Sequence, residues 1–228
     1  MTITSAPAIT TTITLVRHGQ THFNARRVLQ GACDSPLTRT GRAGIAVTAQ
    51  HLSTHTFDAA YTSPQGRAVM TAVELVRGHE DLALRSVDGL REFSFGSFER
   101  RPERELDELE PWSSLVPRIL AGEHPGLPGG ESGADFMARV RDTFGEIIAA
   151  HPGENVLVVG HGLTLGAYLA TIDPIGLVPL PNASVSIVEV TGEAEAGGTI
   201  SRIVSAGVDV AGHGSLAARP ARLPVSAA

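Results

Sequence analysis

A short run of β-branched and apolar residues, Thr11 to Val16, ends abruptly in Arg17-His18-Gly19 and constrains this chain more than any other stretch. An uncharged run of this composition predicts a buried central strand. In open α/β sheets, ligands bind in the crevice beyond the carboxyl ends of the strands. Arg17 and His18 are therefore candidate ligand-binding residues, and Gly19 permits a tight turn and a close approach to the main chain.

A second stretch repeats this arrangement. Glu154 to Gly162 is an apolar strand followed by His161 between two glycines. Two strands that each end in a histidine can place both imidazoles over one pocket. Either histidine alone is equally well explained as a hydrogen-bonded residue at a strand end. Together, they favour a chemical role.

Strands alternate with helices along most of the chain, which predicts an α/β sandwich. The last two strands, 185–190 and 200–204, are joined by a short connection, so we expect an antiparallel edge on a mostly parallel sheet. The other expected elements are strands at 57–62 and 82–87, a helix capped by Thr38 or Thr40, and helices at about 63–76, 132–150 and 163–172.

Three segments lack a clear period. Residues 21–36 predict a long loop over the pocket, and residues 207–228 a loosely packed tail in which His213 is incidental. Residues 88–130 predict a cap-like insertion with short helices near 103–110 and 112–120. We expect this insertion to cover the site and to select the substrate. The whole chain, 1–228, is predicted to form one domain.

The amino-acid composition limits the classes of binding partner and the cellular location that can be expected. The net charge of −6 and the scarcity of Lys/Arg runs argue against nucleic acid, although a local arginine cluster can still bind a small anion. No stretch approaches the ~18 apolar residues of a membrane span. The first twelve residues make a poor secretory signal, and the single cysteine, Cys33, favours a reducing compartment. The expected location is the cytoplasm, and Cys33 is expected to be an inert thiol.

Several motifs resemble those of the histidine phosphatase superfamily, in its phosphoglycerate-mutase-like branch. They occur in family order from about residue 13 to about residue 204, and together they are far more specific than an Arg-His-Gly tripeptide alone. This resemblance implies a three-layer α/β/α fold. The motifs are Arg17-His18-Gly19-Gln20-Thr21, Asn24, Gln30-Gly31, Asp34-Ser35-Pro36-Leu37-Thr38, Gly41, Ser63-Pro64, Arg67, Thr71-Ala72, Glu92, Phe95-Gly96, Gly129-Gly130-Glu131-Ser132 and Gly160-His161-Gly162.

The resemblance implies that His18 becomes phosphorylated during the reaction. A neutral imidazole with an ordinary pKa near ~6.5 suits a nucleophile at pH 7. Arg17 offers a planar fork of donors for phosphate oxygens. Arg67 and His161 would complete the phosphate cage, His161 as a protonated imidazole that donates through both nitrogens. A cation in the first turn of a helix, as expected for Arg67, opposes the helix dipole unless an anion is near.

Glu92 matches the acid/base position of the family. One carboxyl group can protonate the leaving alcohol and later deprotonate the attacking water. Flanking aromatic residues would desolvate Glu92, whereas an isolated glutamate in a loop is more often solvated. The remaining phosphate- or substrate-binding residues implied by the resemblance are Asn24, Gln30, Gly31 and Gly162.

No metal-ligand set is visible in the sequence, and no cofactor is expected. The predicted function is metal-independent hydrolysis of a small phosphorylated metabolite. One alternative is a cofactor-dependent phosphoglycerate mutase, and another is a non-catalytic phospho-ligand sensor. The sensor is disfavoured because every matched catalytic position is occupied. The chain does not reveal the substrate or the oligomeric state.

Departures from the mutase pattern favour hydrolysis. Mutases of this family follow the equivalent glutamate with Arg-His-Tyr, whereas Phe93-Ser94-Phe95 follows Glu92 here. The insertion before Gly129 is short and lacks the paired arginines of the mutases, and Leu163 replaces an asparagine. Arg100 and Arg101 could supply such cations only if the insertion folds inward.

Overall fold

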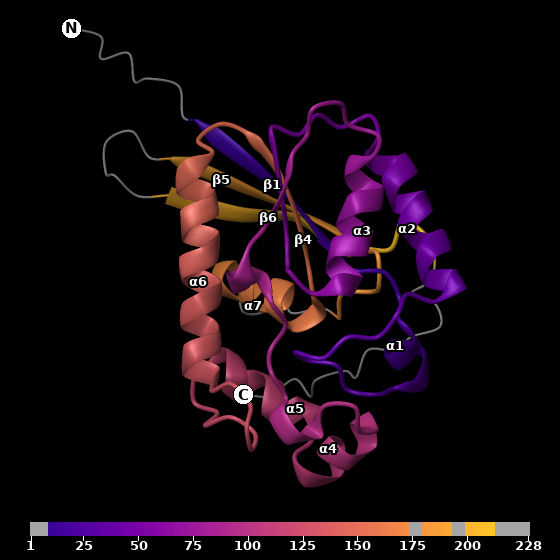
Figure 1. Ribbon diagram of the computed structural model, residues 1–228. Helices are drawn as coiled ribbons and strands as arrows, with labels where there is room; N and C mark the ends of the chain where they lie inside the picture. Colours follow the sequence, from indigo (N-terminus) through magenta and orange to yellow (C-terminus); the bar gives the residue numbers. More distant parts are fainter. Residues whose placement is uncertain (1–8, 174–178, 193–198, 213–228) are drawn as a thin grey trace, which may run out of the picture.

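The computed structural model describes residues 9–173, 179–192 and 199–212. Its centre is a six-stranded sheet with the strand order β3-β2-β4-β1-β5-β6 (Figure 1). The strands are β1 (Thr10–Arg17), β2 (Ala59–Thr62), β3 (Leu84–Ser86), β4 (Asn155–Gly160), β5 (Val185–Gly192) and β6 (Thr199–Val208).

Strand β1 lies in the interior of the sheet, parallel to β4 on one side and antiparallel to β5 on the other. Strands β3, β2, β4 and β1 are parallel to one another. Strands β5 and β6 form the antiparallel edge. The expected mostly parallel sheet with an antiparallel edge is confirmed.

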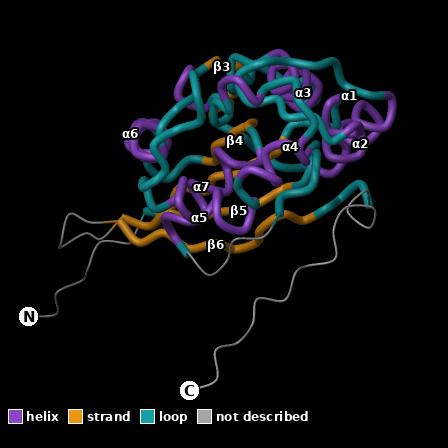
Figure 2. Tube along the Cα trace, turned by 90° about the horizontal axis from the view of Figure 1, so that it is seen from below, coloured by secondary structure: helices purple, strands orange, loops and turns teal. Residues whose placement is uncertain are grey.

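Two helical layers cover the sheet, which confirms the three-layer sandwich (Figure 2). Alternate residues of β1 point to opposite layers: Ile13 and Leu15 pack into one core, and Val16 packs into the other. This alternation explains the uncharged run of β-branched and apolar residues, because both faces of β1 are buried. The first core contains α6 (Gly133–Ala150) and α7 (Gly162–Ile172), and the second contains α2 (Arg39–Leu52) and α3 (Gly66–Val76).

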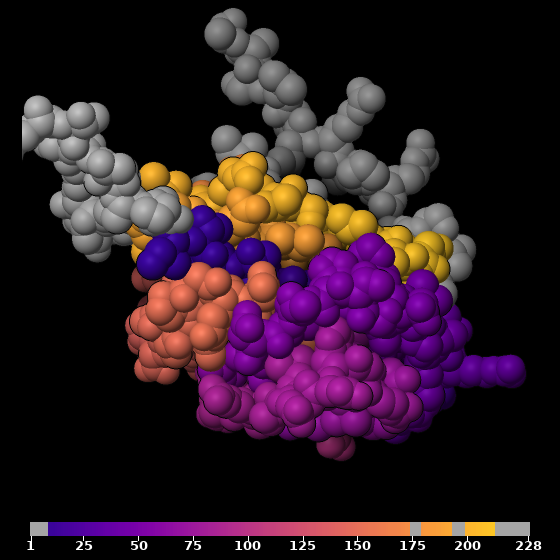
Figure 3. Space-filling model, turned by 90° about the horizontal axis from the view of Figure 1, so that it is seen from above, coloured from indigo at the N-terminus to yellow at the C-terminus, as the bar shows by residue number. Residues whose placement is uncertain are grey.

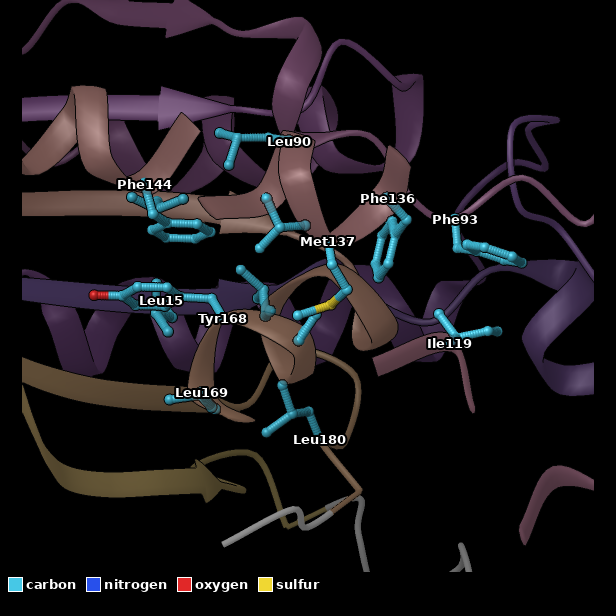
Figure 4. Close-up of a cluster of buried hydrophobic side chains, with 14 of the residues drawn as sticks. Leu15, Leu90, Phe93, Ile119, Phe136, Met137, Phe144, Tyr168, Leu169 and Leu180 are labelled. Atoms are coloured by element: carbon cyan, nitrogen blue, oxygen red, sulfur yellow. The ribbon is translucent and has the colours of Figure 1, made fainter. Parts of the chain in front are cut away.

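The core beneath α6 continues into the insertion. Phe136 of α6 packs edge-on against Phe93, with ring centroids 5.3 Å apart, and Ile119 lies below Phe93 in the view of Figure 4. Leu106 and Leu115 are also buried in this core. Figure 3 shows the insertion (magenta) on the opposite side of the molecule from β6 (yellow). Its elements are the 3-10 turns η1 (Asp88–Leu90) and η2 (Gly96–Phe98) and the helices α4 (Glu103–Leu109) and α5 (Trp112–Leu120).

Residues 21–36 are not entirely a loop, as the sequence had suggested, because they contain the short helix α1 (His22–Arg26). A capping box starts this helix: the Thr21 hydroxyl accepts from the Asn24 N–H, and the Asn24 side chain accepts from the Thr21 N–H. Arg27 ends it in the left-handed conformation. Five residues are too few for an apolar period to show in the sequence.

Three further element boundaries can be compared with the predictions from the sequence. Thr38 caps α2, as one of the two alternatives predicted. Helix α3 begins at Gly66, after the N-cap Gln65, and not at Ser63-Pro64. Strand β6 ends at Val208, just beyond the predicted start of the tail, and His213 lies outside the described residues. In the described part of the chain, no helix is both long and apolar enough to cross a membrane.

Candidate active site

The pairing of β1 with β4 brings His18 and His161 together. Arg17 lies opposite Gly160 in this parallel pair, and the His18 N–H donates to the Gly160 carbonyl at 2.9 Å. The two imidazole rings meet edge-on, with centroids 5.2 Å apart. Only 3% of His18 and none of His161 is exposed. The two histidine motifs therefore converge on one place, as their repeated design suggests.

A hydrogen bond defines the tautomer of His18. Its Nδ1 lies 2.8 Å from the Gly19 carbonyl oxygen, which can only accept, so Nδ1 carries the proton. The lone pair of the neutral ring is then on Nε2. Burial, followed by the charges of Arg67 and Arg17, holds the pKa of His18 well below 6.5. His18 is therefore an uncharged imidazole at pH 7, with Nε2 free to attack an electrophile.

Arg67 is buried and not a solvated surface residue. Its guanidinium pairs with Asp34 at 2.8 Å and donates to the carbonyl oxygens of Gly31 and Cys33, also at 2.8 Å. Gly31 adopts φ +55°, a conformation that favours glycine, and its carbonyl thereby faces Arg67. Asp34 also accepts from the N–H of Gly66 at the start of α3. The carboxylate therefore offsets the unfavourable placement of a cation at this helix end.

Four buried donors or acceptors of the site have no partner in the described protein: Nε of Arg17, Nε of Arg67, Nδ1 of His161 and Oε1 of Gln30. The other end of the Arg17 guanidinium donates to the Leu180 carbonyl. A Cβ on Gly162 would lie 3.3 Å from Arg17 Cζ, so a side chain there would crowd the guanidinium. Burial lowers the pKa of Arg17, yet a guanidinium stays charged at neutral pH. The set can thus bind an anion.

His161 is held by Ser63, whose Oγ lies 2.8 Å from Nε2. Burial, then the positive charges of Arg67, Arg17 and Arg139, keeps the pKa of His161 well below 6.5. The ring is therefore neutral in the unliganded protein. The protonated clamp expected for His161 would require the negative charge of a bound phosphate.

Glu92 is fixed at the N-terminus of α7. Its Oε1 accepts from the N–H of Thr164 and the N–H of Phe93, each at 3.0 Å, and lies 3.0 Å from the Thr164 hydroxyl, which has a shorter contact of 2.7 Å with the Arg91 carbonyl oxygen. Its Oε2 accepts from the N–H of Leu163 at 3.1 Å. The carboxylate satisfies main-chain donors that a helix leaves free at its start. Oε1 is thus an anchor, and Oε2 has fewer protein contacts.

A partly buried ion pair supports the segment that carries Glu92. Arg139 of α6 pairs with Glu131 at 2.6 Å and donates to the carbonyl oxygens of Gly89 and Arg91. Glu131 belongs to the Gly-Gly-Glu-Ser motif. This motif therefore helps to position the acid/base candidate without entering the cavity.

The candidate residues surround one cavity of about 640 Å³. All of them line the cavity except His161, whose ring packs against that of His18. Asn24 uses its side-chain oxygen in the capping box of α1, and Gln30 is buried with Oε1 unpartnered. The lining residues are Arg17, His18, Asn24, Val28, Leu29, Gln30, Gly31, Arg67, Glu92, Phe95, Glu103, Trp112, Val116, Gly162, Leu163, Gly166, Pro179 and Leu180.

The sequence reasoning missed four supporting residues. Ser63 and Asp34 belong to quoted motifs, but nothing indicated that they hold His161 and Arg67. The Asn182 side chain donates to the His18 carbonyl at 3.1 Å, and no motif pointed to it. Thr164 could have been found, because the first turn of the helix after His161-Gly162 is a carboxylate-binding position.

Among the described residues, no cluster of three or more His, Cys, Asp or Glu side chains is suited to hold a metal ion. Residues 13–200 match the sequence profile of the histidine phosphatase superfamily (branch 1). This chain belongs to that superfamily. The resemblance is confirmed, and so is the class of enzyme, a phosphatase of the histidine phosphatase type.

Relatives of this histidine phosphatase have different names. A probable phosphoglycerate mutase GpmB of Yersinia enterocolitica is 35% identical over 166 residues, covering 72% of this chain and 75% of the relative. A putative phosphoserine phosphatase 2 of Hydrogenobacter thermophilus is 32% identical over 188 residues, covering 78% and 89%. The solved structure of Bacillus stearothermophilus YhfR has a TM-score of 0.72 at 28% identity, covering 88% of this chain and 99% of that one.

The lowered pKa values of His18 and His161 predict that this histidine phosphatase becomes less stable against unfolding as the pH falls. Below pH 6.5 the unfolded chain binds protons that the folded ring nitrogens resist, so the free energy of unfolding should fall. The limiting slope is ~1.4 kcal/mol per pH unit for each histidine. The free energy of unfolding can be measured by urea denaturation at several pH values between 6.5 and 5.5. It should fall less steeply with decreasing pH in the double variant His18→Asn/His161→Asn than in the wild type. Equal slopes would contradict the prediction.

Proposed function

We propose that this protein hydrolyses phosphomonoesters through a phosphohistidine on Nε2 of His18. The observation that carries the proposal is the hydrogen bond from His18 Nδ1 to the Gly19 carbonyl. Because Nδ1 holds the proton, Nε2 is the nitrogen with the free lone pair. That nitrogen lies in a cavity with two arginines and a carboxylate, Arg17, Arg67 and Glu92. Phosphoryl transfer requires this combination of an aligned nucleophile and donors around the equatorial oxygens.

The reaction has two steps. Nε2 of His18 attacks phosphorus, the phosphorus–oxygen ester bond breaks, and Glu92 gives a proton to the leaving alcohol. Water then attacks the phosphohistidine, the phosphorus–nitrogen bond breaks, and Glu92 takes a proton from the water. Arg17, Arg67 and His161 bind the phosphoryl oxygens, and Asn24, Gln30, Gly31 and Gly162 contribute further contacts. The positive charge comes from the arginines, so we propose a metal-independent enzyme acting in the cytoplasm.

The arginines of the insertion favour hydrolysis over mutase activity. Arg100 and Arg101 are both exposed, and neither lines the cavity. Arg101 lies over the Phe98 ring at 5.5 Å and pairs with Glu105 at 3.7 Å. A mutase must hold a phosphorylated acceptor during transfer, which requires cations beyond the phosphate cage. Among the described lining residues, the only arginines are Arg17 and Arg67.

The test uses two substrates in excess EDTA. p-Nitrophenyl phosphate should release inorganic phosphate at an undiminished rate, because no step needs a metal. 3-Phosphoglycerate with a trace of 2,3-bisphosphoglycerate should give inorganic phosphate or nothing, with little 2-phosphoglycerate. Rapid formation of 2-phosphoglycerate, detected by NMR, would establish the mutase instead. Stoichiometric binding without phosphate release would establish a sensor, and loss of activity in EDTA restored by Mg²⁺ would contradict metal independence.

A further inference from the structure

Much of the cavity wall is apolar. It includes Val28, Phe95 and Leu163, together with Trp112 and Val116 of α5. Trp112 meets the ring of Phe95 edge-on, with centroids 5.7 Å apart. The volume of about 640 Å³ is within the range of sites that enclose organic ligands larger than a three-carbon phosphate. A cavity of this size and lining therefore suits a hydrocarbon group in addition to the phosphate.

Apart from Arg17 and Arg67, the charged residues that line the cavity are acidic. Glu92 and Glu103 both line the cavity, and the described lining residues include no lysine. Glu103 pairs with Arg27 at 3.3 Å, but the Arg27 side chain is 83% exposed and is not part of the wall. The charge of Glu103 is close enough to raise the pKa of Arg17 slightly against the effect of burial. A second anionic group on a substrate would meet carboxylates and aromatic rings.

We infer that the preferred substrates are phosphomonoesters of alcohols with an apolar group of several carbons and no second anionic group. This inference rests on the proposed phosphatase activity. A hydrocarbon chain gains about fourfold in affinity for each methylene that the wall buries. A terminal carboxylate loses hydration against the same wall and meets no counter-ion there. The insertion thus selects by burial, whereas the cage binds the phosphate common to all candidates.

Three alkyl esters separate these effects. Ethyl phosphate and hexyl phosphate differ by four methylenes but have leaving alcohols of similar basicity, so the chemistry is matched. 6-Phosphonooxyhexanoate has the same six carbons as hexyl phosphate, with the terminal methyl oxidised to a carboxylate. We expect kcat/KM to be at least about 20-fold higher for hexyl than for ethyl phosphate. The carboxylate ester should be at least about tenfold poorer than hexyl phosphate.

A charge variant tests the role of Glu103. Glu103→Gln should raise kcat/KM for 6-phosphonooxyhexanoate by at least about threefold, because a repulsive charge is removed. Glu105→Gln is the matched control, since Glu105 belongs to the same helix, α4, and does not line the cavity. In Glu105→Gln, the kcat/KM for 6-phosphonooxyhexanoate relative to that for hexyl phosphate should be the same as in the wild type.

The results of these assays distinguish a failure of the inferred substrate class from a failure of the proposed phosphatase activity. Phosphate release at equal kcat/KM from all three esters, or a preference for the carboxylate, would overturn the inferred substrate class and leave the phosphatase standing. The same effect in Glu103→Gln and Glu105→Gln would overturn the role of Glu103. No phosphate release from any ester or from p-nitrophenyl phosphate would contradict the proposed function and the inference with it.

Discussion

Replacing His18 with alanine should lower phosphate release from every phosphomonoester by ~10⁴-fold or more, with the fold intact. The variant loses the only nitrogen that we place in line with the phosphorus. It retains Arg17 and Arg67, so it should still bind phosphate. The folded state should survive, since β1 keeps its main-chain pairing with β4 and β5 on both sides.

Rapid quenching after a brief incubation with ³²P-labelled substrate would detect the intermediate directly. The wild type should carry acid-labile, base-stable phosphate, as a phosphohistidine does. His22→Ala is the matched control, because His22 is an exposed histidine on α1 close to the site in sequence. It should label like the wild type. Label that persists in His18→Ala would place the nucleophile elsewhere.

Replacing Glu92 with glutamine should separate substrates by the basicity of their leaving group. An alkoxide needs a proton, so phosphorylation of His18 by hexyl phosphate should slow by ~10²–10⁴-fold. p-Nitrophenolate leaves without one, so that substrate should still form the phosphoenzyme. Because water is no longer deprotonated by Glu92, the phosphoenzyme should then accumulate. Single-turnover labelling with both substrates measures each step.

The hydrogen bonds of Glu92 make this substitution informative. The amide oxygen of glutamine can replace Oε1 and accept from Thr164 and Phe93, so the side chain stays anchored. The amide nitrogen replaces Oε2 and meets only the Leu163 N–H, a modest conflict. Equal rate losses for the two substrates would show that Glu92 has a structural role. Thr164→Val, which removes one anchoring donor but retains the carboxyl group, should affect both steps together.

The sequence was sufficient to predict the sheet and the converging histidines. Thr11 to Val16 is an uncharged run of β-branched and apolar residues, and the strand before His161 is apolar. A polar residue at the carboxyl end of a parallel strand lies at the edge of the sheet where ligands bind. The position of Arg67 in the first turn of α3 also indicated an anion nearby. The structure shows that Asp34 is that anion.

Other features depend on contacts that no local pattern records. Glu92 binds Thr164 across a sequence separation of 72 residues, and Asn182 reaches the His18 carbonyl across 164 residues. Helix α3 starts later than Ser63-Pro64 predicted, and the Ser63 hydroxyl contacts His161 instead of capping the helix. The apolar wall of the cavity required the packing of the whole insertion.

The place of β1 in the sheet has a consequence during protein synthesis. This strand is synthesised about 140 residues before β4 (Asn155–Gly160) and earlier still relative to β5 (Val185–Gly192), the two strands with which it pairs. At ~5–20 residues per second, the apolar segment that carries the nucleophile waits on the order of ten seconds without either partner. An unpaired apolar strand is prone to pair with another chain. The nascent chain therefore exposes this unpaired strand before it can assemble the site, and chaperones that bind extended apolar segments should recognise residues 10–17.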